Sequence, residues 1–155
     1  MSSSAPRTAA VLLGAAVVTA SAVLPAAAAG HAPHHRAPHS PVVVGAVQYD
    51  SPGRDDRSNR SLNGEWVTVS NTGRKPVDLK GWTLAKDGRH VYHFKNVRLA
   101  GRSSVRVHTG VGRDTRRDVY QDSRQYIWDN NDTATLRDSR HRVVDVKHWS
   151  GRRDR

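Results

Sequence analysis

Arginine is the residue type whose number and spacing suggest chemistry most directly. The chain contains 25 lysine and arginine residues against 14 aspartate and glutamate residues, which gives a net charge of +11. A set of arginines occupies a central segment, a later turn and the C-terminus: Arg113, Arg116, Arg117, Arg124, Arg137, Arg140, Arg142, Arg152 and Arg153. A guanidinium binds phosphate through two parallel hydrogen bonds, and a basic surface attracts polyanions by releasing counterions. The set predicts a surface for nucleic acid or an anionic cell-wall polymer; the alternative is that the charge only keeps the protein soluble.

Three aromatic residues lie near these arginines in the sequence, namely Tyr120, Tyr126 and Trp128. Aromatic rings can stack on bases or sugars with little regard to base identity. The sequence contains no RNA-recognition, helix-turn-helix or zinc-finger signature. We therefore expect any binding of a polyanion to depend on salt and to be indifferent to nucleotide sequence.

A second candidate for chemistry is the stretch YDSPGRDDRSNRSLNGE, which is rich in hard oxygen ligands of the kind that Ca²⁺ prefers. The residues that could supply these oxygens are Asp50, Asp55, Asp56, Asn59 and Glu65. Arginines interleave with them and can pair with the same carboxylates, and the spacing differs from that of an EF-hand loop. We predict no dedicated metal site, and this stretch is the calcium candidate if a cation binds.

The residues needed for enzyme catalysis are not grouped in this sequence. The chain has no cysteine, no G-x-S-x-G nucleophile motif and no H-E-x-x-H zinc motif. The histidines that follow residue 42 fall on or beside different expected strands: His90, His93, His108, His141 and His148. We predict no catalytic residue, no cofactor and no enzyme activity. The alternative is a cryptic metal-assisted hydrolase or nuclease that uses His108 or His148.

The N-terminal segment has the features of a secretory signal peptide. A single basic residue, Arg7, precedes an apolar run over residues 9–24, and small residues at Ala27 and Ala29 satisfy the cleavage rule. The run is shorter than the ~20 residues that span a bilayer, which argues against the alternative of a retained anchor. We predict a signal peptide over residues 1–29, cleavage near Ala29, and a secreted product with no membrane span.

A proline- and histidine-rich linker is expected over residues 30–41, because HAPHHRAPHSP offers nothing apolar to bury. Four of its histidines could chelate a transition metal loosely: His31, His34, His35 and His39. A ligand set without a scaffold seldom forms a site, so we predict none here.

From Val42 onward, apolar residues alternate with period two, and no helical period is present. The expected strands cover residues 42–49, 65–71, 77–85, 91–97, 104–110, 126–129, 133–138 and 142–149. Turn residues such as Asn63-Gly64 and Asp87-Gly88 separate them. Short strands at this regular spacing predict a β-sandwich or barrel, and without cysteine its packing must suffice without disulfides.

The alternation also predicts which side chains form the core. Val67 and Val69 share one face of their strand, and Val105 and Val107 lie opposite Arg106 on theirs. Trp82 and Leu84 share a face just after Gly81, where a small residue allows the strand to bend. These apolar side chains should fill the space between two sheets.

The ordered blocks NGEWVTVSNTG, PVDLKGWTL, LAGRSSVRVHTGVG and NNDTATLRDSRHRVVD resemble those of the lamin tail domain. This is the immunoglobulin-like domain of nuclear lamins, which also occurs in exported bacterial proteins. The resemblance covers about Val42 to Trp149 and identifies the chain as an exported bacterial member of the family. It implies an all-β, immunoglobulin-like sandwich that serves as an interaction module and has no catalytic residues. The arginine-rich segment 113–124 and the C-terminal GRRDR depart from the family pattern.

Four regions therefore follow from the sequence. They are a signal peptide (1–29), a linker (30–41), a lamin-tail-like β-sandwich (42–149) and a basic C-terminal tail (150–155). The expected function is that of a secreted, non-enzymatic binding module for polyanions. A further alternative is a structural accessory domain that docks another secreted protein through an exposed sheet edge.

Overall fold

A computed structural model describes residues 40–151, which lie within one compact unit. The predicted signal peptide, most of the linker and the tail arginines Arg152 and Arg153 lie outside the described residues. The predicted boundaries of these regions therefore stay predictions.

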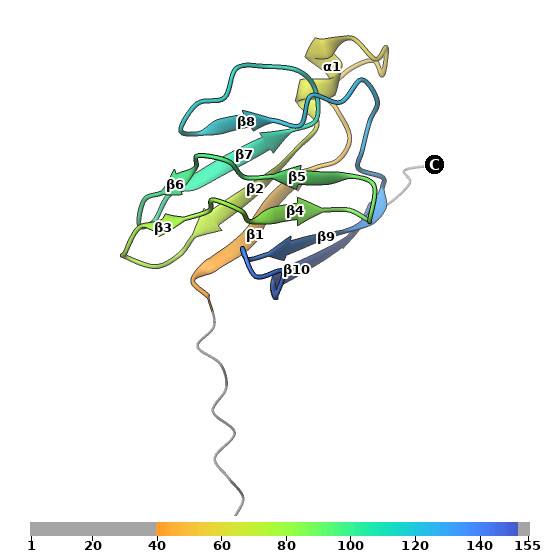
Figure 1. Ribbon diagram of the computed structural model, residues 1–155. Coiled ribbons are helices and arrows are strands. Elements are labelled where there is room, and N and C mark those ends of the chain that lie inside the picture. The colour runs from red at the N-terminus through yellow and green to blue at the C-terminus, as the bar shows by residue number, and fades with distance from the viewer. Residues whose placement is uncertain (1–39, 152–155) are drawn as a thin grey trace, which may run out of the picture. The chain divides into compact units, whose positions relative to one another are not determined.

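The described residues form strands almost throughout (Figure 1). The strands are β1 (Val42–Gln48), β2 (Trp66–Asn71), β3 (Val77–Asp78), β4 (Thr83–Ala85), β5 (Val91–His93), β6 (Arg98–Leu99), β7 (Ser104–His108), β8 (Asp118–Tyr120), β9 (Asn131–Arg137) and β10 (Val143–Ser150). One short helix, α1 (Asn59–Gly64), precedes β2.

Two four-stranded sheets make up the body of the domain. The first sheet has the strand order β1-β2-β7-β8, and the second sheet has the order β10-β9-β4-β5. Strands β3 and β6 form a separate two-stranded pair. All pairings are antiparallel except that of β7 with β8, which is parallel. The predicted all-β, immunoglobulin-like sandwich without a disulfide is confirmed.

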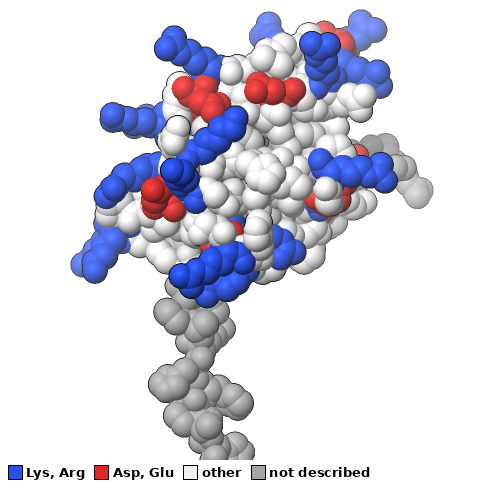
Figure 2. Space-filling model, viewed as in Figure 1, with Lys and Arg blue, Asp and Glu red and all other residues white. Residues whose placement is uncertain are grey.

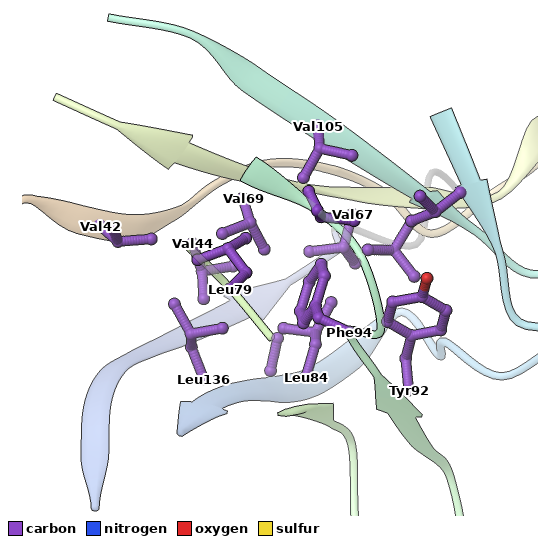
Figure 3. Close-up of a cluster of buried hydrophobic side chains, with 14 of the residues drawn as sticks. Val42, Val44, Val67, Val69, Leu79, Leu84, Tyr92, Phe94, Val105 and Leu136 are labelled. Atoms are coloured by element: carbon purple, nitrogen blue, oxygen red, sulfur yellow. The ribbon is translucent and has the colours of Figure 1, made fainter. Parts of the chain in front are cut away.

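The core lies between the two sheets and consists of the alternating side chains that the sequence predicts. Val67, Val69, Val105 and Val107 are almost completely buried. Figure 3 shows valines of β1 and β2 facing Leu84 and Leu136 of the second sheet across the interior. Leu84 is a core residue as predicted, whereas Trp82 is partly buried and packs against the edge of the core.

The expected strand 77–85 is in fact two strands, β3 and β4, in different sheets. Gly81 adopts a φ of +77° at the break, a conformation that side chains with a Cβ rarely adopt. The expected strand 91–97 likewise ends at His93, and Phe94 donates its backbone N–H to Trp82 as the chain leaves the sheet. The alternation of apolar residues therefore runs through two places where the chain leaves its strand, at Gly81 and after His93.

The strand predicted over residues 126–129 is wrong. This segment contains no strand, although Ile127 and Trp128 are buried in the core. The backbone N–H of Ile127 donates to the Glu65 carboxylate at 2.8 Å instead of to a neighbouring strand. A side-chain acceptor thus replaces the sheet ladder at this position.

Two elements were not predicted, α1 and β8. The helix begins after Ser58, whose hydroxyl accepts the backbone N–H of Ser61, and it buries Leu62. Six residues are too few to show a helical period, which is why the sequence pattern did not reveal this helix. Strand β8 lies within the arginine-rich segment, where Val119 is the one large apolar residue turned into the core.

Candidate functional site

A groove with a volume of about 800 Å³ separates the β8 region of the first sheet from the segment that follows β5 in the second. Tyr92, Val97 and Val119 form its apolar floor, since all three are largely buried. The remaining lining residues are Pro76, Lys95, Asn96, Arg98, Ala100, Asp114, Thr115 and Arg116. The groove therefore combines a buried apolar floor with charged walls.

Three cationic side chains line this groove: Lys95, Arg98 and Arg116. All three are exposed, and among residues 40–151 none of them forms an ion pair within 4 Å. Their charges are therefore available to an anionic ligand. Sequence reasoning selected Arg116 but missed Lys95 and Arg98, which are far from it in the chain and come close only through the sandwich.

One wall of the groove is held in place by two side chains of the loop before β8. Asp114 Oδ1 accepts the backbone N–H of Tyr120 at 3.0 Å, and Thr115 Oγ1 accepts that of Asp118 at 3.0 Å. The backbone N–H of Thr115 also donates to the Asp118 carbonyl at 2.7 Å. These bonds occupy the outer edge of β8 and fix the position of Arg116 between them.

Tyr92 supplies the polar group of the groove floor. Its ring is 8% exposed and packs edge to face against Phe94, with ring centroids 4.9 Å apart (Figure 3). Burial raises the pKa of the phenol well above its ordinary value, and the negative charges of Asp114 and Asp122 raise it further. The hydroxyl therefore keeps its proton and can act as a hydrogen-bond donor at the groove.

The structure places the predicted arginines in different surroundings. Arg116 lines the groove, Arg117 lines a depression with Arg106 on the outer face of the first sheet, and Arg137 lines a third with His93. Arg142 pairs with Asp138 at 2.7 Å. The other described members of the set are exposed: Arg113, Arg124 and Arg140.

Basic and acidic side chains are mixed on the surface. Figure 2 shows lysine and arginine around the margin of the visible face, with acidic side chains between them and an uncharged centre. On this face the basic side chains are therefore spread around the margin and are not gathered in one patch. Local groupings such as that of the groove become the places where an anion could meet several cations at once.

The predicted stacking aromatics have other contacts. Trp128 is buried in the core, and the Tyr126 hydroxyl lies 2.6 Å from that of Ser61. Tyr120 stacks on His108 with ring centroids 5.1 Å apart. Since these rings already pack against the protein, they do not form an open platform for bases.

The oxygen ligands of the calcium candidate point in different directions. Glu65 is fully buried, and its Oε1 accepts hydrogen bonds from Thr109 and Ile127. Asn59 exchanges hydrogen bonds with the backbone of Val111, and Asp56 accepts the backbone N–H of Ser58. Residues 40–151 contain no group of three or more His, Asp or Glu side chains arranged to hold a metal ion.

The two histidines considered for catalysis are engaged in structural contacts. His108 Nδ1 lies 2.9 Å from the Asn63 carbonyl, and its Nε2 lies 2.9 Å from Asp118 Oδ1. His148 Nδ1 lies 2.7 Å from Thr133 Oγ1. His108 thus has both ring nitrogens facing acceptors, an arrangement that holds the β7–β8 pair and leaves no free nitrogen to accept a proton from a substrate.

A small two-sheet sandwich of this kind is an immunoglobulin-like domain. The family model of the Lamin Tail Domain matches residues 35–151, and the chain belongs to this family. Lamin tail domains are immunoglobulin-like interaction domains without catalytic function. No curated protein matches the chain. Within the described range, no helix has the length and apolarity to traverse a bilayer.

Proposed function

We propose that this protein is a secreted, non-enzymatic module that binds polyanions through its basic surface, with the groove as the principal contact. The polyanion is a nucleic acid or an anionic cell-wall polymer, which share the phosphodiester group. The observation that carries the proposal is the grouping of Lys95, Arg98 and Arg116 around one groove without an anionic partner among residues 40–151. Membership of an interaction-domain family supports a binding role.

The chemistry of the groove favours binding without sequence preference. Guanidinium and ammonium groups contact phosphate oxygens, and each neutralised phosphate releases counterions, so affinity must fall steeply with salt. The exposed arginines elsewhere on the domain add to the long-range attraction but have no fixed geometry around a common ligand. Secretion is supported by the apolar run over residues 9–24 and the small residues that follow it.

The test is a titration of the purified chain Gly30–Arg155 with a duplex DNA and, separately, with poly(glycerol phosphate). Affinities are measured at about 50 mM and about 200 mM salt. Over this range, the affinity of a protein that makes several phosphate contacts falls by orders of magnitude. We expect binding to both polymers at low salt. If neither polymer binds at low salt, the proposal is contradicted.

A matched pair of variants locates the contact. The triple variant K95A/R98A/R116A removes the groove cations, and the control R54A/K80A/R89A removes the same charge from exposed positions elsewhere. The groove variant should make the slope of log affinity against log salt shallower by about 3, and the control should change it little. Equal losses in the two variants would show that net charge, and not the groove, determines binding.

Secretion is tested by expressing the full chain in a bacterium with a C-terminal tag. We expect the tagged protein in the culture medium, with an N-terminus at or next to Gly30. Retention of the full-length chain in the cell fraction would contradict this part of the proposal.

A further inference from the structure

Strand β5 has a free backbone edge beside the groove. Lys86 donates its backbone N–H to the His90 carbonyl, and Phe94 donates to the Trp82 carbonyl. In an antiparallel pair, hydrogen-bonded positions alternate, so Tyr92 faces β4 while Val91 and His93 turn their N–H and C=O groups away from it. Among residues 40–151, no backbone group pairs with that outer side, and β5 is the last strand of its sheet (Figure 1).

The two edges of the first sheet are occupied. Asp114 and Thr115 bind the outward N–H groups of β8. On β1, Val44 donates its backbone N–H to Asp145 Oδ2 at 2.7 Å, and Val42 donates to Ser40 Oγ at 3.2 Å. Side chains thus cap both edges against another strand.

The other edge of the second sheet, β10, carries different protection. Its pairing with β9 is irregular between Val143 and Asp145, it carries Lys147, and Asp145 reaches across to β1. A bulge, a lysine and an inward-reaching carboxylate are known devices that discourage strand addition. Among the edges of the two four-stranded sheets, β5 is therefore the one with the fewest obstacles.

The surfaces on the two sides of the β5 edge differ in chemistry. Tyr92 faces the groove, where Lys95, Arg98 and Arg116 lie. On the opposite face, Val91 and His93 line a shallow depression. The rest of that depression is formed by Thr83, Ala85, Lys86, Asp87, Gly88, Thr135, Arg137 and His141. A strand added to β5 would send alternate side chains to these two surfaces.

We propose that β5 accepts an extended acidic peptide of a partner protein as an additional strand. Its acidic side chains, at every second position, face the three groove cations, and small or β-branched side chains between them lie beside Val91 and His93. The peptide gains main-chain hydrogen bonds from Val91 and His93 and charge pairing from the groove, the two components of recognition by strand addition. This goes beyond polyanion binding, because it requires a polypeptide backbone.

Each of the two surfaces carries one acidic residue, Asp114 in the groove and Asp87 in the depression, and the cations of each surface outnumber it. Asp114 binds the backbone N–H of Tyr120, and Asp87 binds the backbone N–H groups of Arg89 and His90. Asp87 also contacts the His90 ring at 3.1 Å. The cations of the groove have no such partners among the described residues, so the charge offered to a ligand is positive.

The test uses an acetylated and amidated octapeptide of alternating Glu and Thr, titrated against Gly30–Arg155 by calorimetry. Two further peptides carry N-methyl groups on all Glu residues or on all Thr residues. Since the amides of alternate residues point to opposite sides of a strand, one methylated peptide should lose binding and the other should keep it. No binding of the parent peptide, or equal binding of all three, overturns the inference.

A matched pair of variants tests the edge from the protein side. His93→Pro removes the outward N–H, whereas His93→Ala removes the side chain and keeps it. We expect His93→Pro to weaken the peptide roughly five- to tenfold relative to His93→Ala, the effect of one lost hydrogen bond. Equal affinities in two variants that both retain the wild-type circular dichroism spectrum overturn the inference.

The same variants separate this inference from the proposed function. His93→Pro should leave the affinity for duplex DNA unchanged, because phosphate contacts need no free amide, and K95A/R98A/R116A should weaken both ligands. Peptide binding with no binding of either duplex DNA or poly(glycerol phosphate) would contradict the proposed function alone. DNA binding without peptide binding would sink the strand-addition inference alone.

Discussion

Glu65 accepts the backbone N–H of Ile127 at 2.8 Å, although 62 residues separate them in the chain. The same oxygen, Oε1, accepts the Thr109 hydroxyl at 2.5 Å, and the Glu65 side chain is fully buried. The carboxylate thus joins the start of β2 to the segment that carries Ile127 and Trp128 into the core. A buried acidic side chain serves here as a structural acceptor, not as a ligand for a cation.

Replacing Glu65 by Ala should destabilise the domain severely. The substitution leaves the backbone N–H of Ile127 and the Thr109 hydroxyl buried without an acceptor. Each such group costs about 1–3 kcal/mol, so we expect a loss of about 3 kcal/mol in the free energy of unfolding. Urea unfolding followed by tryptophan fluorescence measures it. Asp55→Ala, at an exposed position, is the control, and a loss for Glu65→Ala no larger than that of the control would contradict this role.

The stability of the domain should also depend on the charge of Glu65. Burial raises the pKa of this carboxyl above its ordinary value of 4.5, against the lowering effect of its hydrogen bonds. The folded state therefore binds the proton more tightly than the unfolded state, and this contribution to stability is lost as pH rises above 4.5 through the folded pKa. Glu65→Gln keeps an acceptor oxygen and cannot ionise, so its unfolding free energy should fall less than that of the wild type between pH 4.5 and 7.

The unfolding free energy at acid pH provides a control for the assignment of the pH dependence to Glu65. Hydrogen bonds from His90 and Arg89 lower the pKa of Asp87 well below its ordinary value. The pKa of Asp138 is also lowered, because hydrogen bonds to Arg142 and Arg140 outweigh the effect of its burial. Carboxyls with a lowered pKa stabilise the folded state at pH values above their ordinary pKa, and this stabilisation is lost as the pH falls through the lowered pKa. Wild type and Glu65→Gln should therefore lose stability in parallel below about pH 3.5, and a divergence confined to that range would contradict the assignment to Glu65.

The sequence predicts the sheets well because burial of alternate side chains is a local pattern. The valines of β2 and β7 face inward as the period of two requires, since a shift of one residue would place them in water. The pattern fails where a non-local contact replaces the ladder. Residues 126–129 have the composition of a strand, but the partner of Ile127 is a side chain from the start of β2, which no local pattern contains.

The candidate site is predictable only in part, for a similar reason. Arg116 stands out because it lies in an arginine-rich run, while Lys95 and Arg98 belong to a segment that resembles a strand end. Only the sandwich places β8 beside the segment after β5 and brings the three together. Conversely, nearness in sequence suggested a calcium set that the fold disperses, because the chain turns Glu65 inward and Asn59 toward Val111.

Gly101 should tolerate no side chain, because a Cβ there would overlap the backbone carbonyl of Arg74. We expect Gly101→Ala to cost about 1–3 kcal/mol in unfolding free energy, as overpacking against a fixed backbone does. Gly88 is the matched control, since a Cβ there meets nothing within 4 Å. Thermal unfolding should show a clear decrease in Tm for Gly101→Ala and no decrease for Gly88→Ala. Equal midpoints would mean that the turn before β7 relaxes freely.

Asp145 should protect the edge of β1 through its bond to the Val44 backbone N–H at 2.7 Å. Asp145→Ala leaves that amide without its acceptor, so its hydrogen exchange should accelerate about tenfold, the effect of one lost hydrogen bond to a charged group. Asp145→Asn keeps an acceptor oxygen and should retain most of the protection. The exposed edge should also raise self-association of Asp145→Ala, measured by sedimentation. Unchanged exchange at Val44 in Asp145→Ala would show that the packing of β1 beside β10, and not this carboxylate, shields the strand.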